Sequence, residues 1–173
     1  MDVPVIEQVR IQAQVLVPLV QALQAELGEQ RANAIVRKAL GALYRGYGEK
    51  WWQAREGSGF GEAMASVFST FARGDALTYR VVAQTPDRFD ADVTRCRYAE
   101  FYQAMGAPEL GMLLTCNADF AMTGGFGDDV TLTRTQTIME GASHCDFRYR
   151  ITRDARSAPP HPLPPPGDGD APG

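Results

Sequence analysis

Residues 77–93 read LTYRVVAQTPDRFDADV, and the spacing of their apolar side chains is that of two strands. Every second position is apolar, with Leu77, Tyr79, Val81 and Ala83 in the first half and Phe89, Ala91 and Val93 in the second. Alternation with a period of two is typical of strands that bury one face. The residues between the halves, Thr85-Pro86-Asp87, favour a turn. This stretch therefore predicts an antiparallel hairpin.

The same alternation returns further along the chain, where residues 130–138 and 145–151 predict a second hairpin. Between the two hairpins the apolar spacing is helical over residues 98–105 and from residue 108 to about residue 122. Residues 124–127, GGFG, predict a loop. Hairpins joined by helices favour an antiparallel sheet over βαβ units, so the predicted fold class is α+β.

Upstream of the first hairpin, residues 1–74 are mainly helical in pattern. Apolar residues recur three or four positions apart from Val5 to Leu27, from Val36 to Trp51 and from Met64 to Phe71. Pro18 is expected to kink or split the first of these helices, and Gly28 to end it. We expect the helical half to pack on a small sheet made of the two hairpins. The N-terminal helices could also join two copies in a homo-oligomer.

Residues 1–155 are expected to form a single domain, because a chain of this length can bury enough surface for a core. From residue 156 to residue 173 the composition is dominated by Pro, Gly, Asp and Ala. Such a tail cannot bury enough apolar surface and is expected to be disordered. His161 lies in the tail and is discounted as a catalytic residue.

The composition argues against several classes of function. The net charge is −4 with both signs interspersed, whereas nucleic-acid binding needs a concentrated basic face. No apolar run reaches the roughly 18 residues that span a bilayer, and no basic segment typical of a secretory signal opens the chain. The three cysteines form no CxxC pair and favour reduced thiols. We therefore expect a cytoplasmic protein that binds a small molecule, not nucleic acid or a membrane.

A first group of reactive side chains lies in residues 109–119. On a helix, Cys116 and Asp119 are three residues apart and share a face, and Glu109 lies along the same stripe. A neighbouring carboxylate raises the pKa of a thiol, so Cys116 would need a cation or an imidazole nearby to act as a nucleophile. The alternative is a core cysteine beside a surface aspartate.

A second group lies in residues 141–149 and contains the one histidine outside the tail. Alternation along a strand gives two sets, with His144, Asp146 and Arg148 on one face and Cys145, Phe147 and Tyr149 on the other. This pattern predicts a core role for Cys145 and a pocket role for the set with His144. The alternative for Asp146 and Arg148 is a surface ion pair, which contributes little.

Three blocks of sequence stand out by their order and spacing. They are VTRCRYAEFY at residues 93–102, GAPELG at 106–111 followed by CNADF at 116–120, and RTQTIMEGASHCDFRY at 134–149. In that order they resemble the L-2-amino-thiazoline-4-carboxylate hydrolase family, well over residues 90–152 and loosely in the helical half. The last strand also resembles, more weakly, small-molecule-binding domains of the vinyl-reductase type.

The family resemblance implies a hydrolase that opens a cyclic isothiourea carboxylate to an N-carbamoyl amino acid such as N-carbamoyl-L-cysteine. Two routes are open for this reaction. Cys116 could attack the ring carbon as a thiolate. Alternatively, Asp119 or His144 could deprotonate a water that attacks directly.

The expected substrate-binding residues are Arg134, Asp146, Arg148, Glu109, Tyr98 and Tyr102, and the expected structural thiols are Cys96 and Cys145. Arg134 or Arg148 could bind the substrate carboxylate through two parallel hydrogen bonds. A carboxylate could hold the protonated amidine through a charge-assisted hydrogen bond.

No cofactor is expected, although four side chains are of the types that bind zinc, namely Cys116, Asp119, His144 and Cys145. Two rival functions remain open. One is a non-catalytic module that binds a small ligand. The other is a biosynthetic tailoring enzyme with a larger heterocyclic substrate, which a cavity for two rings lined by Tyr98, Tyr102 and Phe126 would favour over the small thiazoline.

Overall fold

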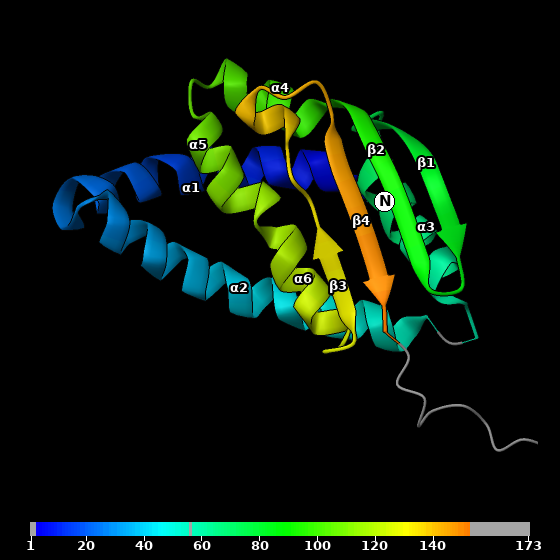
Figure 1. The fold of residues 1–173 in the computed structure, drawn as a ribbon. Coiled ribbons are helices and arrows are strands. Elements are labelled where there is room, and N and C mark those ends of the chain that lie inside the picture. Colours follow the sequence, from blue (N-terminus) through cyan, green and yellow to red (C-terminus); the bar gives the residue numbers. More distant parts are fainter. Residues whose placement is uncertain (1–2, 56, 153–173) are drawn as a thin grey trace, which may run out of the picture.

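The structure is a computed structural model that describes residues 3–55 and 57–152, and the Pro/Gly-rich tail expected at 156–173 lies outside these residues. Its elements in chain order are α1 (Val5–Leu27), α2 (Glu29–Ala54), α3 (Phe60–Ala72), β1 (Leu77–Thr85), β2 (Arg88–Cys96), α4 (Arg97–Ala104), α5 (Pro108–Gly111), the π-helical turn η1 (Met112–Cys116), α6 (Ala118–Phe126), β3 (Val130–Thr133), the 3₁₀ turn η2 (Ile138–Glu140) and β4 (Cys145–Ile151). Figure 1 shows the helices gathered beside a single sheet. The α+β fold class is confirmed.

The two predicted hairpins form one four-stranded antiparallel sheet. Its strand order is β1-β2-β4-β3, so the hairpins join where β2 pairs with β4. The first hairpin is as predicted. The second is shorter than predicted, because β3 ends at Thr133. The backbone N–H groups of Thr135 and Gln136 donate to the Asp146 carboxylate instead of pairing with a strand.

Helices α1 and α2 form a long helical hairpin with Gly28 at its bend (Figure 1). Gly28 ends α1 as predicted, with a φ of 79° that favours glycine. Of the two expected effects of Pro18, a kink or a split, the split does not occur, since α1 continues through this residue. Pro18 and Gln14 are both exposed, so water can hydrate the Gln14 carbonyl that proline leaves without its helical donor.

Helices α2 and α6 cross with their backbones in close contact. A Cβ atom on Gly48 would lie 2.0 Å from the Met122 carbonyl oxygen, and one on Gly125 would lie 2.1 Å from the Arg45 carbonyl oxygen. The prediction of a loop at residues 124–127 is therefore wrong for its first three residues, which belong to α6. Glycine lowers helix propensity, but here its missing side chain permits the crossing.

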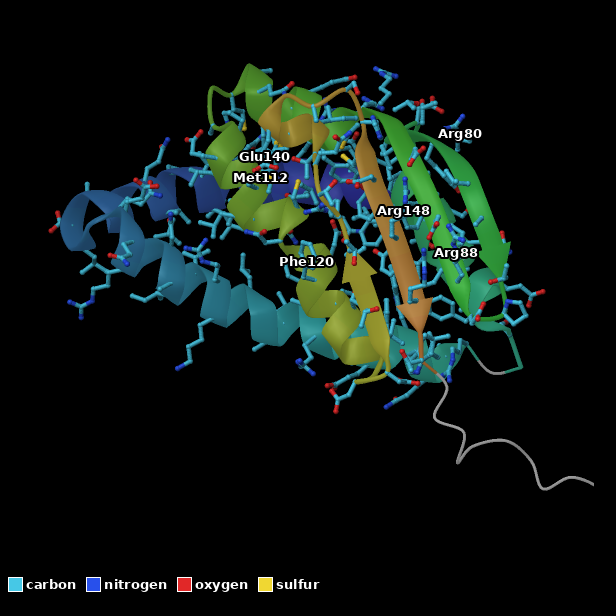
Figure 2. All side chains as sticks on the ribbon, in the orientation of Figure 1. Arg80, Arg88, Met112, Phe120, Glu140 and Arg148 are labelled. Atoms are coloured by element: carbon cyan, nitrogen blue, oxygen red, sulfur yellow. The ribbon has the colours of Figure 1, made fainter. Side chains whose placement is uncertain are left out.

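The sheet has an apolar inner face and a charged outer face. Phe89, Ala91 and Val93 on β2 point inward and pack with α3 and α6. On the outer face, Asp90 and Asp92 lie among arginine side chains, including Arg88 and Arg148, which Figure 2 labels. Within the described part of the chain, no helix is both long and apolar enough to span a membrane.

Candidate functional site

A cavity of about 400 Å³ lies between the inner face of the sheet and the helices. Its walls come from α1, α2, α3, the η1–α6 segment and β4, so both halves of the chain contribute. Most of the lining side chains are apolar or aromatic. The charged lining residues are Asp119 and Arg134, and they form an ion pair.

Arg134 is almost fully buried, with 3% of its side chain exposed. Its Nη1 donates to Asp119 Oδ2 at 2.5 Å, and its Nη2 donates to the Cys116 carbonyl oxygen at 3.1 Å. The guanidinium carbon lies 5.1 Å and 5.2 Å from the ring centres of Phe120 and Phe147. Cation–π contacts of this kind, together with the ion pair, offset the cost of burying the charge.

The position of Arg134 depends on Asp146. The Asp146 carboxylate accepts hydrogen bonds from Thr135 N at 2.9 Å, Thr135 Oγ1 at 2.6 Å and Gln136 N at 3.0 Å. These three bonds fix the chain directly after Arg134. Asp146 itself does not line the cavity. The expected substrate contact stays a prediction, and the hydrogen bonds of Asp146 bear on the cavity through Arg134.

A π-helical turn positions Cys116 and Asp119. In η1 the N–H of Asn117 donates to the carbonyl of Met112, five residues back, at 3.0 Å. The extra residue in this turn rotates the following helix relative to an ordinary α-helix, and such turns are frequent at functional sites. Cys116 and Asp119 both line the cavity, so the structure brings together the first predicted pair.

The pKa of the Asp119 carboxyl is raised to about 6 because the carboxyl is buried, although the Arg134 guanidinium acts in the opposite direction. Asp119 lines the cavity, and 28% of its side chain is accessible. Burial also raises the pKa of the Cys116 thiol well above its ordinary value, and the negative charge of Asp119 raises it further. Cys116 is therefore a neutral thiol at neutral pH.

The two other thiols also line the cavity. Burial raises the pKa of Cys96 to about 11 and also raises that of Cys145. Cys145 is buried, and its sulfur accepts a hydrogen bond from the Ile138 N–H at 3.2 Å. The structural role that we expect for both residues stays a prediction.

The structure places His144 and Arg148 outside the cavity. His144 contacts Gln136 and Ser143 through its ring nitrogens. Arg148 lies on the outer face of the sheet, where it donates to Asp92 at 2.7 Å. The predicted alternation is right, but the faces are exchanged, because the set with Cys145, Phe147 and Tyr149 lines the cavity.

Two of the remaining candidates also lie outside the cavity. Glu109 is exposed in the first turn of α5. Tyr102 is buried in the helical core, and its hydroxyl accepts a hydrogen bond from Thr115. Tyr98 does line the cavity, and its hydroxyl donates to the Phe71 carbonyl oxygen at 3.0 Å.

Several lining residues are not among the predicted site residues, because they come from the helical half. Tyr44 and Trp51 on α2 and Phe68 and Phe71 on α3 all face the cavity. In the sequence their spacing reads as an ordinary core stripe. The one feature of the sequence that could have indicated a cavity lining is the number of aromatic residues in these stripes. Among residues 3–55 and 57–152, no three or more His, Cys, Asp or Glu side chains are grouped so that they could hold a metal ion.

Comparisons with known proteins place the chain in a family. No curated protein matches it significantly. Among solved structures, it is similar to the phenol-responsive sensory domain of the transcription activator PoxR, crystallised with phenol, at 11% identity and a TM-score of 0.45, over 79% of this chain and 72% of that one. The family model described as L-2-amino-thiazoline-4-carboxylic acid hydrolase matches residues 8–149. The chain therefore belongs to the L-2-amino-thiazoline-4-carboxylic acid hydrolase family.

Proposed function

We propose that the protein is a cytoplasmic hydrolase that opens a cyclic amidine or isothiourea, with Asp119 as the general base. The observation that supports this most is the buried Asp119 carboxyl, whose pKa of about 6 lies close to neutral pH. A base is most effective when its pKa is near the working pH, because it is then mostly ionised and still accepts a proton readily. Family membership supports the same reaction class.

For an isothiourea ring the proposed step balances as follows. Asp119 accepts a proton from a water, and the water oxygen bonds to the ring carbon between nitrogen and sulfur. The carbon–sulfur bond then breaks, and the sulfur leaves with the proton that Asp119 returns. The second hydrogen of the water passes from the new hydroxyl to the ring nitrogen as C=N is replaced by C=O. The product is a urea with a free thiol, which is the N-carbamoyl form when the ring derives from cysteine. Asp119 thus acts first as a base and then as an acid.

Attack by water is favoured over attack by Cys116. A thiolate is the nucleophilic form of cysteine, and burial holds the pKa of Cys116 well above its ordinary value. Asp119 raises this pKa further, so it would oppose formation of the thiolate until it had itself taken up the thiol proton. We assign Cys116 to the cavity wall beside the reacting carbon.

The test is release of thiol from two cyclic isothioureas, 2-amino-2-thiazoline and L-2-amino-thiazoline-4-carboxylate, by the purified protein, against the constant background of its own three cysteines. We expect Asp119→Asn to lose at least about 100-fold in kcat, the usual contribution of a general base. Cys116→Ala should keep most of the turnover. Loss of turnover in a folded Cys116→Ala variant would move the nucleophile to the thiol.

A non-catalytic ligand-binding module is the second candidate. The observation that favours it is that Asp119 and Arg134 already satisfy one another inside a largely apolar cavity. Such a module would bind the same cyclic amidines or isothioureas but would hydrolyse none of them. Ligand binding without any thiol or ammonia release, by a protein with a native circular dichroism spectrum, would decide for it.

A further inference from the structure

The cavity is larger than a single five-membered ring requires. Its volume of about 400 Å³ lies in the range of roughly 300–1,000 Å³ that is usual for pockets holding drug-sized ligands. A monocyclic thiazoline would fill a minor part of this space. Because empty apolar space forfeits dispersion contacts along its walls, the cavity fits a ligand with at least two fused rings better.

The charges in the cavity do not suit an anionic ligand. Arg134 is the one cationic side chain among the described residues that line it. The charge of Arg134 is already paired with that of Asp119 through Nη1, and Nη2 makes a further hydrogen bond to the Cys116 carbonyl oxygen. A ligand carboxylate would bring a second negative charge close to Asp119 without gaining an unpaired cation, and like charges repel strongly where water is excluded.

Asp119 suits a ligand head group that donates hydrogen bonds. Its Oδ2 accepts from Arg134, and the two oxygens of a carboxylate offer about four acceptor positions. The N–H groups of an amidine can therefore donate to Asp119 while the ion pair stays intact. This arrangement places the amidine carbon beside Asp119, where the proposed attack by water requires it.

Aromatic side chains form the walls beyond this head group. The rings of Phe147 and Tyr149 on β4 are nearly parallel, at 7° with 6.2 Å between their centres. Trp51 and Phe71 form another pair with centres 5.5 Å apart. All four residues line the cavity. Ring-on-ring contacts contribute beyond simple burial of area, so these walls favour a flat aromatic ligand.

The mouth of the cavity lies between α1 and α2. The exposed residues among its described lining are Gln8 and Gln12 on α1 and Leu43 and Tyr47 on α2. Leu43 and Tyr47 are 47% and 45% exposed, which leaves apolar surface at the entrance. Since the Arg134 side chain is only 3% exposed, the ion pair marks the inner end, and the apolar part of a ligand would point outward.

We propose that the substrate is a flat cyclic amidine or isothiourea, neutral or cationic, with a second apolar ring and no carboxylate. Its amidine lies against Asp119, and its second ring lies among the aromatic walls and points toward Leu43. The reaction assigned to this substrate rests on the proposed hydrolase function. The binding preference rests on the cavity alone.

The test is calorimetric titration of the full chain with three probes. They are 2-aminobenzothiazole, which has two fused rings, 2-amino-2-thiazoline, which has one ring, and L-2-amino-thiazoline-4-carboxylate, which adds the carboxylate. We expect the fused-ring probe to bind at least about tenfold tighter than the single ring, because it buries more apolar area. The carboxylate should bind more weakly than either.

A matched pair of variants locates the second ring. Leu43→Gln should weaken binding of 2-aminobenzothiazole about threefold or more and leave 2-amino-2-thiazoline unaffected. Ile35→Gln is the control, because Ile35 lies on the same helix, is also 47% exposed and does not line the cavity. It should change neither affinity.

The outcomes separate the two proposals. Equal or tighter binding of the carboxylate, or no binding of the fused-ring probe, overturns the substrate class, even if the carboxylate is hydrolysed and the hydrolase function stands. Tight binding of the fused-ring probe without turnover of any probe supports the preference for a flat apolar ligand and counts against the hydrolase function. An equal effect of Leu43→Gln and Ile35→Gln overturns the proposed orientation.

Discussion

Asp119 gives the proposed reaction a defined pH dependence. Burial raises the pKa of this carboxyl to about 6, and the general base works in its ionised form. Activity should therefore be constant above about pH 7 and fall about tenfold per pH unit below pH 6. The measurement is kcat/KM between pH 5 and 8. An acidic limb near pH 4, the ordinary range of a carboxyl, would contradict a raised pKa for the base.

Asp146 should control the reaction from outside the cavity. Asp146→Ala removes the acceptor of three hydrogen bonds that fix the chain after Arg134. Since Arg134 lowers the pKa of Asp119, a displaced Arg134 should shift the acidic limb of the pH profile upward and lower kcat by about tenfold or more.

A purely structural role for Asp146 would reduce the amount of folded protein without moving the limb. Asp128→Asn is the control, because Asp128 is exposed and does not line the cavity. It should leave both the limb and kcat unchanged.

Single residues could be predicted where the signal is local. Cys116 and Asp119 share a face because of their spacing, and the structure places both in the cavity. Arg134 reaches Asp119 from 15 residues away, and no spacing rule joins the two. The faces of β4 are exchanged relative to the prediction, because alternation defines two faces of a strand but does not say which one the helices cover.

Among the elements, the strands were predictable because alternation with period two is a local property. The long helices α1 and α2 were predictable as well, because helical spacing of apolar residues is also a local property. The π-helical turn was not, because it inserts one residue into a helix whose composition is ordinary. The GGF end of α6 was also missed, since only the crossing with α2 explains glycine inside a helix.

That crossing leads to a stability prediction. Gly48→Ala places a Cβ atom 2.0 Å from the Met122 carbonyl oxygen, so α2 and α6 must move apart, at a cost of about 3 kcal/mol. Gly46→Ala is the matched control in the same helix, because nothing lies within 4 Å of its added Cβ atom. It should stabilise the protein by about 0.5–1 kcal/mol through helix propensity. Urea unfolding measures both, and equal effects would contradict the close crossing.

The molecule as a whole is organised by its sheet. One face carries aromatic side chains into the cavity, and the other carries a network of arginines around Asp90 and Asp92. The aspartates therefore hold the outer face of β2 to β4 without taking part in the cavity. Activity and acid stability should depend on different carboxyl groups.

Asp90 provides the test of this separation. Burial acts to raise its pKa, but hydrogen bonds from Arg88 and Arg150 outweigh burial and hold the pKa below its ordinary value. A lowered pKa in the folded state contributes stability above the unfolded pKa of about 4, and that contribution is lost as the pH falls through the folded pKa. Asp90→Asn should therefore lower the free energy of unfolding by about 2 kcal/mol at pH 7 and by much less at pH 3, while the acidic limb of activity set by Asp119 stays in place. Urea unfolding at the two pH values, beside the pH profile of kcat/KM, measures both quantities. A deficit that is equal at pH 3 and pH 7 would mean that the charge of Asp90 does not stabilise the sheet.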